Sequence, residues 1–105
     1  MPNHKNRWRI QVLEAALTHN TELLGKMDPF VTLKACGQSW KTSVAEDQGK
    51  TPRWRHERMK LLIDGDVPEG EELEIIVEDK EKRGADLIGH CKLNLASVLK
   101  DQNEW

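Results

Sequence analysis

The stretch "PFVTLKACGQSWKTSVAE" (29–46) predicts two strands joined by a tight turn. Alternate residues of its first part are apolar and share one face of a strand: Val31, Leu33 and Ala35. Pro29 suits the entry of this strand because proline has no N–H to donate inside a ladder. Gly37 and Gln38 have the length of a hairpin turn, and "SWKTSVAE" (39–46) then predicts the partner strand. The stretch therefore favours an antiparallel hairpin.

Four further segments are short, rich in apolar residues and bounded by turn residues, as strands are. They are "WRIQVLEA" (8–15), "RWRHERMKLLI" (53–63), "LEIIVED" (73–79) and "LIGHCKLNL" (87–95). In the second of them, Met59, Leu61 and Ile63 recur with period two. The final "ASVLKDQNEW" (96–105) predicts a short helix or a tail. Six short strands without a long helical pattern predict an all-β protein, an antiparallel β-sandwich.

The length and the charge balance narrow the class of protein. We expect the 105 residues to form a single domain over 1–105, with its core at about 8–99. The 16 basic and 18 acidic side chains give a net charge of −2, which excludes a generic polyanion-binding or nucleic-acid-binding protein but allows a local basic patch. No signal peptide or membrane span is visible, so a cytoplasmic protein is expected. Cys36 and Cys91 are expected to be buried thiols, with partial exposure as the alternative for Cys36 beside the Gly37 turn.

Two loops concentrate acidic residues. The first, "HNTELLGKMD" (19–28), carries Glu22 and Asp28. The second, "EDKEKRGAD" (78–86), carries four acids: Glu78, Asp79, Glu81 and Asp86. Loops at one end of a sandwich lie close together, and converging carboxylates repel one another unless a cation joins them. Calcium takes roughly six to eight oxygen ligands from such loops. The alternative is that both loops are simply solvated, and spacing alone favours that interpretation.

Five ordered motifs carry a resemblance to a known family: "GKMDPFVTL", "WKTSV", "GKTPRW", "LEIIVED" and "ADLIG". In this order and spacing the chain resembles a C2 domain, in particular the small single-domain C2 proteins of plants and protists. The resemblance implies a β-sandwich with C2-like Greek-key topology, in a family that often binds calcium and phospholipid. A complete C2 domain has eight strands. We therefore expect this chain to lack the last strands: either the domain is truncated, or a partner chain completes it by strand swapping or homodimerisation.

The resemblance also implies a set of calcium ligands: Glu22, Asp28, Asp79, Glu81 and Asp86. The backbone carbonyl of Lys80 would lie between two of them. Glutamate stands at two positions where the family usually has aspartate, and the second loop is one residue shorter than is common, so Glu78 competes with Asp79 for its role. Cations in that loop repel a divalent ion unless they point outward. We therefore expect Ca²⁺ binding to be weak or lost.

Two surfaces for anionic phospholipid follow from the resemblance. Apolar residues of the first loop form a membrane-inserting tip or, alternatively, pack against neighbouring loops: Leu23, Leu24 and Met27. Basic residues are candidates for contact with lipid headgroups, the alternative being plain solvation: Lys34, Lys41, Arg55, Lys80, Lys82 and Arg83. On the concave face of the middle strands, Arg53, Arg58 and Lys60 are expected beside Lys34 and Lys41.

The middle strands also carry two tryptophans and a misplaced charge. Trp40 and Trp54 are expected in the core. Arg58 falls where the family has a core aromatic residue, and a β-bulge would repair this by turning the apolar residues that follow it inward.

No catalytic arrangement is visible, because neither His19 nor His90 has an acid or a nucleophile at a telling spacing. We therefore predict a non-catalytic C2-type module, peripheral to the membrane, that targets anionic phospholipid with weak calcium dependence. The alternative is a calcium-independent C2 domain that binds a protein partner in a scaffold or cytoskeletal assembly.

Overall fold

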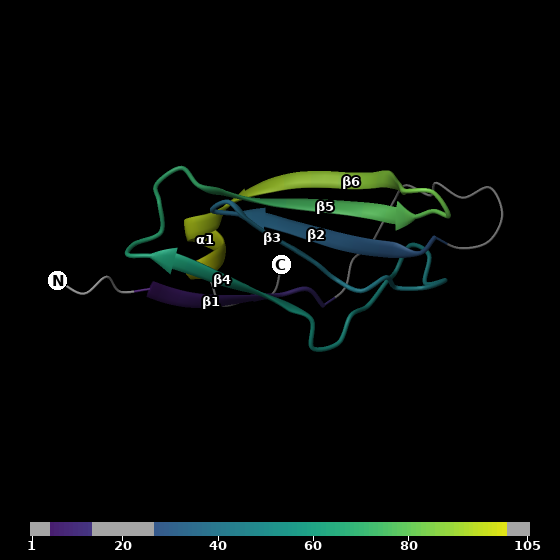
Figure 1. The fold of residues 1–105 in the computed structure, drawn as a ribbon, viewed down its shortest axis with the longest axis horizontal. Coiled ribbons are helices and arrows are strands. Elements are labelled where there is room, and N and C mark those ends of the chain that lie inside the picture. The colour runs from purple at the N-terminus through teal and green to yellow at the C-terminus, as the bar shows by residue number, and fades with distance from the viewer. Residues whose placement is uncertain (1–4, 14–26, 101–105) are drawn as a thin grey trace.

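The computed structural model describes residues 5–13 and 27–100. These residues form six strands and one short helix (Figure 1): β1 (Lys5–Gln11), β2 (Pro29–Ala35), β3 (Gln38–Lys41), β4 (Arg58–Asp64), β5 (Glu72–Lys80), β6 (Ala85–Asn94) and α1 (Leu95–Lys100). All the strand pairs are antiparallel. The predicted all-β antiparallel sandwich is confirmed. No helix within these ranges has the length and apolar composition needed to cross a membrane.

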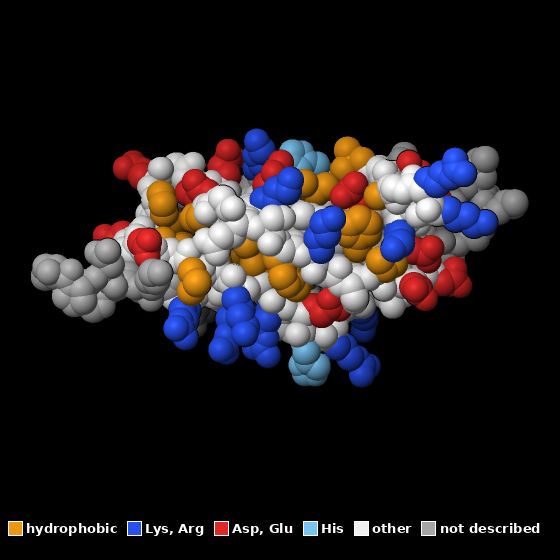
Figure 2. Space-filling model, viewed as in Figure 1, with side chains coloured by type: hydrophobic (Ala, Val, Ile, Leu, Met, Phe, Trp, Pro, Cys, Tyr) orange, Lys and Arg blue, Asp and Glu red, His pale blue; other side chains and the backbone are white. Residues whose placement is uncertain are grey.

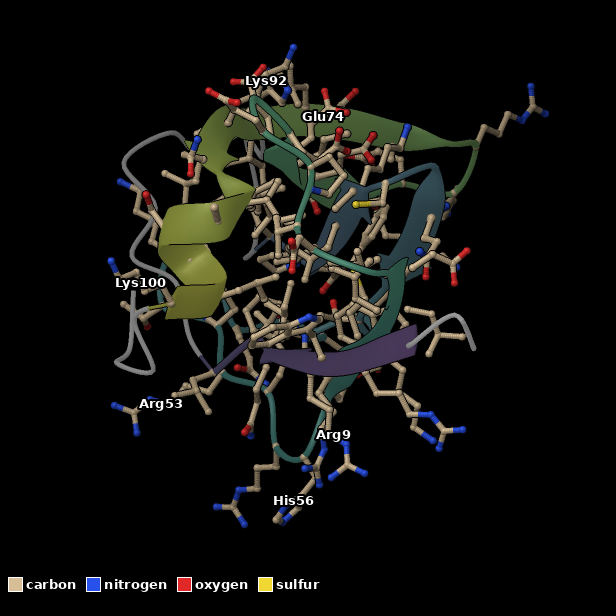
Figure 3. All side chains as sticks on the ribbon, turned by 90° about the vertical axis from the view of Figure 1, so that its left-hand side faces the viewer. Arg9, Arg53, His56, Glu74, Lys92 and Lys100 are labelled. Atoms are coloured by element: carbon tan, nitrogen blue, oxygen red, sulfur yellow. The ribbon has the colours of Figure 1, made fainter. Side chains whose placement is uncertain are left out.

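The two layers of the sandwich differ in width. Among the described residues, β3, β2, β5 and β6 form one sheet in that order, whereas β1 pairs with β4 alone. Figures 1 and 3 show α1 between the layers, on the side of the molecule where β6 lies rather than β3. The helix therefore covers part of the inner face that the narrower sheet leaves uncovered.

Strict alternation builds the core between the layers. Every second residue of β4 is buried, which confirms the inward face predicted from period two. The buried cluster joins apolar residues of both sheets, of the connection before β4 and of α1: Val31, Leu33, Ala35, Ala45, Trp54, Met59, Leu61, Ile63, Leu73, Leu95, Val98 and Leu99. Trp54 is only 4% exposed, as predicted, whereas Trp40 is half-buried and packs against the cluster.

Polar side chains connect the two layers where β3 faces β4. Gln38 Nε2 donates to the Leu62 carbonyl at 2.6 Å, and Gln38 Oε1 accepts the Leu62 N–H at 3.1 Å. The Ser43 N–H and hydroxyl donate to the two Glu57 carboxylate oxygens at 2.5 and 2.6 Å. The Trp54 indole N–H donates to the Ser43 carbonyl at 2.8 Å, which satisfies a buried donor. Hydrogen bonds therefore close this side of the sandwich.

The hairpin between β2 and β3 turns one residue earlier than predicted. Ala35 pairs with Gln38, so the turn residues are Cys36 and Gly37 rather than Gly37 and Gln38. Their φ values are 51° and 72°, and a two-residue turn with two positive φ angles matches the twist of the flanking strands. The sequence concealed this turn because cysteine rarely occupies the left-handed region. The Cys36 N–H donates to Glu71 Oε1 at 2.6 Å, which holds the turn against the connection between β4 and β5.

Two strands have other limits than the predicted ones. β1 begins at Lys5 rather than Trp8, and β3 covers Gln38–Lys41 instead of 39–46. Residues beyond Lys41 leave the ladder because the chain must cross to the other sheet. The crossing still begins on β2, since the Thr42 N–H donates to the Val31 carbonyl at 2.9 Å.

β4 contains no β-bulge, so that expectation is wrong. Its register with β1 is continuous from Asp64 to Arg58, and Arg58 points outward as the first residue of the strand. The irregularity lies earlier, at His56, whose φ is 56°. In the described sheets, the register shifts between Val77 and Glu78 of β5 instead.

The inner face of β5 and β6 is only partly covered by the other layer. Leu73 is buried, but Ile75 and Val77 are half-buried, and Cys91 opposite Ile75 is exposed. Cys36 is half-buried in its turn, and both cysteines are free thiols. The expectation of two buried cysteines is therefore wrong, because Cys91 lies on an uncovered part of β6, whereas the alternative of a partly exposed Cys36 at a turn agrees with the structure.

Neighbouring leucines of β4 provide a test of this packing. Leu61 is 0% exposed and Leu62 is 48% exposed. We expect Leu61→Ala to lower the free energy of unfolding by about 2–5 kcal/mol, through lost burial and the cavity left behind. Leu62→Ala, the matched control, should change it by less than about 1 kcal/mol. Chemical denaturation measures both, and equal losses would contradict the assigned faces.

The two thiols should differ in reactivity. Burial raises the pKa of the Cys36 thiol, and the charge and hydrogen bond of Glu71 raise it further. A higher pKa leaves less thiolate at a given pH, and the thiolate is the nucleophile. We expect a thiol reagent to label exposed Cys91 before Cys36 at mildly alkaline pH, and Glu71→Gln to accelerate labelling of Cys36. An unchanged Cys36 rate in Glu71→Gln would contradict the role of this carboxylate.

A carboxylate-bearing loop end and its basic surroundings

One end of the sandwich brings Asp28 and Asp79 together. Asp28 directly precedes β2, and Asp79 of β5 lies opposite Pro29, the first residue of β2. The Asp28 N–H donates to Asp79 Oδ1 at 2.8 Å, and the Lys80 N–H donates to the Asp28 carbonyl at 3.0 Å. The pairing of β2 with β5 therefore fixes the two aspartates side by side. Figure 1 shows this end, where β2 begins and the β5–β6 hairpin turns.

The two carboxylates occupy different environments. The Asp79 side chain is fully buried, and burial of a carboxylate is tolerated only with hydrogen-bonding partners such as the Asp28 N–H. Asp28 is half-buried, and its Oδ1 accepts the Asp47 N–H at 2.6 Å. The loop around Asp47 is held nearby because the Gly49 N–H donates to the Met27 carbonyl at 3.0 Å. Three chain segments thus converge on this pair.

The other predicted ligands lie along the β5–β6 turn. Asp86 is the register partner of Asp79, but its side chain is exposed. Glu81 is half-buried, and its N–H donates to the Gly84 carbonyl at 3.0 Å, which closes the turn. Glu22 lies outside the described residues. Within residues 5–13 and 27–100, no three acidic, histidine or cysteine side chains gather closely enough to hold a metal ion. The structure therefore joins Asp28 to Asp79 without assembling a larger cluster.

Met27 does not belong to the membrane-inserting tip that is expected from the first loop. Met27 is fully buried at the loop end, so its side chain is not available to a bilayer, and that expectation is corrected. The reason is that Met27 adjoins the start of β2, where the chain already packs into the sandwich. Leu23 and Leu24 lie outside the described residues.

The basic candidates separate into distinct surfaces. Lys80, Lys82 and Arg83 are exposed on the β5–β6 turn, and Figure 2 shows basic groups at this end of the molecule. Lys34 and Lys41 are exposed on the outer face of the wide sheet, where Lys41 Nζ lies 5.8 Å from the centre of the Phe30 ring.

The expectation that Arg58 and Lys60 share a face with Lys34 and Lys41 is wrong. β4 belongs to the narrow sheet, so its outward side chains lie on the other layer. Arg55 belongs to the connection leading into β4 and is likewise separated from the wide sheet. Sequence reasoning also missed two exposed cations on β1, Arg7 and Arg9. The basic–apolar alternation of "RWRI" was the signal that could have found them.

The buried carboxylate should matter for stability as well as for any ligand. Asp79→Ala leaves the Asp28 N–H without its acceptor, so we expect the free energy of unfolding to fall by about 1–3 kcal/mol. Asp86→Ala removes an exposed carboxylate from the adjacent strand and should change it by less than about 0.5 kcal/mol. Thermal or urea unfolding compares the two variants. A larger loss for Asp86→Ala would refute the assigned environments.

Comparison with known proteins agrees with this architecture. The model of the family described as the C2 domain matches residues 6–105. Human extended synaptotagmin-1 is 38% identical over 105 residues, which cover 92% of this chain and 9% of that protein. Elicitor-responsive protein 1 of Oryza sativa subsp. japonica is 33% identical over 79 residues, covering 72% of this chain and 48% of that protein. The chain thus spans less than half the length of either relative.

A solved structure supports the same assignment. The structure of two C2 domains of extended synaptotagmin 2, those designated A and B, superposes with a TM-score of 0.74 and 26% identity, covering 95% of this chain and 33% of that one. The family match, the relatives and the fold therefore agree with the five sequence motifs, and the chain belongs to the C2 domain family.

Proposed function

We propose that this C2 domain is a non-catalytic module that docks on anionic phospholipid membranes, with calcium giving weak assistance. The observation that carries the proposal is the loop end of the sandwich, where the joined Asp28 and Asp79 lie next to an exposed basic turn. Carboxylates beside cations at the end of a rigid sandwich suit contact with a phosphate-bearing surface, directly or through a divalent ion.

The oxygen atoms at this end of the sandwich are of the type that calcium binds. Calcium prefers carboxylate and carbonyl oxygens, and Asp28 and Asp79 would hold it first, with Glu81 and Asp86 next along the β5–β6 turn. A bound ion would add positive charge between these carboxylates and lipid phosphates. The joined pair alone supplies fewer ligands than the roughly six to eight oxygens that calcium takes, which supports weak rather than strong dependence.

Two groups of cations support direct contact with lipid headgroups. Lys80, Lys82 and Arg83 are exposed on the turn, where each charge near an anionic membrane contributes about 1 kcal/mol. On the outer face of the wide sheet, exposed Lys41 pairs with Thr32, which lies two residues before exposed Lys34 on the same face, so the two lysines are neighbours there.

Vesicle co-sedimentation tests the proposal. The protein is mixed with phosphatidylserine-containing vesicles in calcium and, separately, in EDTA. We expect binding in both conditions and a modest increase with calcium, because the basic residues act without the ion and the aspartates act through it. Asp28→Asn should remove only the calcium-dependent increase.

Asp66→Asn is the matched control for this experiment. Asp66 is an exposed acid in the turn between β4 and β5, away from the proposed site, and its substitution should leave the calcium effect unchanged. Absence of vesicle binding in both conditions would overturn the proposal. Recovery of a stoichiometric protein partner by a domain that binds no lipid would favour the scaffold alternative. If calorimetric titration with calcium gave identical traces for wild type and Asp28→Asn, only the calcium part of the proposal would be refuted.

A further inference from the structure

The outer face of the narrow sheet carries a strip of cations that the proposed loop-end site does not use. We name it the basic strip, and its strand members are Arg7, Arg9, Arg58 and Lys60. All four side chains are exposed. Beyond the end of the β1–β4 ladder, the Trp54 N–H donates to the Leu13 carbonyl at 2.7 Å, and exposed Arg53 and Arg55 flank Trp54 there. The strip therefore runs from Arg7 past Arg58 toward Trp54, whereas the other end of the outer face carries the exposed acid Asp64.

The strand register places like charges together. Arg9 lies directly opposite Lys60, and Arg7 and Arg58 each precede them by two residues in their own strands, so they lie on either side of this pair along the ladder. Neighbours on one face of a sheet are about 5 Å apart across the strands and about 7 Å apart along them. Directly opposed like charges destabilise a sheet, so this arrangement costs stability in the absence of an anionic partner.

The protein does not neutralise the strip within its described residues. In the part of the chain that the structure describes, Arg7, Arg9, Arg58 and Lys60 form no ion pair. Glu57 is adjacent in sequence to Arg58, but Ser43 occupies both of its carboxylate oxygens at 2.5 and 2.6 Å. The whole chain has a net charge of −2, so the strip reflects segregation of charge rather than a basic composition.

The strip faces away from the outer face of the wide sheet, one of the surfaces proposed above for membrane docking. Figure 3 shows Arg9 and His56 projecting from the side of the molecule opposite to Glu74 and Lys92, which lie on the wide sheet. Figure 2 shows basic groups along the corresponding lower edge, below the position of β1 and β4 in Figure 1. A domain docked through the wide sheet would therefore turn the strip away from that membrane.

We propose that the basic strip is a second, calcium-independent docking surface for an anionic bilayer. This inference deepens the proposed membrane function and rests on it. The strip is dominated by charge: the large exposed apolar side chains on it and beside it are Leu62 and Leu13, whereas the core of a protein interface is usually apolar and depleted in charged residues. Clusters of about four to eight basic residues are typical of surfaces that bind anionic lipid.

The margin of the strip has a place for a projecting headgroup. A shallow groove of about 520 Å³ lies between β3 and β4, lined by Gln38, Ser39, Trp40, Arg58, Met59 and Lys60. Two cations of the strip thus border a hollow that also has hydroxyl and amide groups. A phosphorylated headgroup standing out from the bilayer can enter there while the remaining cations contact its neighbours.

The experiment measures vesicle binding in EDTA, so that only calcium-independent contacts contribute, and those of the turn and the wide sheet are the same in wild type and variants. Arg9→Gln/Lys60→Gln removes the two directly opposed cations. We expect its partition coefficient on phosphatidylserine vesicles to fall roughly 30-fold at low ionic strength, about fivefold for each charge. The control is Lys50→Gln/Lys100→Gln, which removes the same charge from exposed positions off the strip and should bind like wild type. Added salt should weaken binding of the wild type.

The outcomes separate this inference from the proposed function. If the Arg9→Gln/Lys60→Gln variant retained all of its binding in EDTA, the proposal for the basic strip would be overturned. The loop-end proposal would be unaffected. Absence of EDTA-resistant binding in the wild type would also overturn the strip. The proposal would also be overturned if a soluble inositol phosphate bound the protein as tightly as vesicles do. Capture of an acidic protein by a domain that binds no vesicles would overturn it as well. Because the substitutions relieve a repulsion, the melting temperature should not fall, which excludes misfolding as the cause of a loss.

Discussion

The pairing of β2 with β5 is the interaction on which the rest of the structure depends. Its register places Pro29 opposite Asp79 and Leu33 opposite Ile75, so it sets both the inner face of the wide sheet and the loop end. The Asp28 N–H then reaches the buried Asp79 carboxylate. A slip of one residue would reverse the faces of β2, burying Lys34 and exposing Leu33. It would also separate the two aspartates.

The unequal width of the two layers explains the asymmetry of the core. Where β3 faces β4, Gln38 and Glu57 connect the layers through hydrogen bonds to the opposite chain segment. Toward β6, α1 contributes apolar side chains, but Val77 stays half-buried and Cys91 is exposed. The described residues therefore form a sandwich that is well closed along one side and thinly covered along the other.

Acidic and basic side chains gather on separate surfaces of this molecule, and the small net charge of the chain conceals that separation. Carboxylates lie at the loop end, cations lie on the turn beside them, and further cations lie on the outer face of the narrow sheet. These surfaces point in different directions because the strands run toward the loop end while the sheets face sideways. A C2 domain built in this way presents more than one anion-attracting face, which links the proposed membrane docking to the second surface inferred from β1 and β4.

The sequence by itself determined the family, the number of strands in the described residues, the inward face of β4 and the position of Asp28 before β2. These depend on periodicity and ordered motifs, which are local. Only the tertiary structure decided that the hairpin turns at Cys36, that Met27 is buried, and that β3 and β4 belong to different layers. The alternation of apolar and polar residues shows that a side chain faces outward, but it does not show to which of the two sheets its strand belongs. For this reason the sequence predicts Lys60 beside Lys41, whereas it lies opposite Arg9 in the structure.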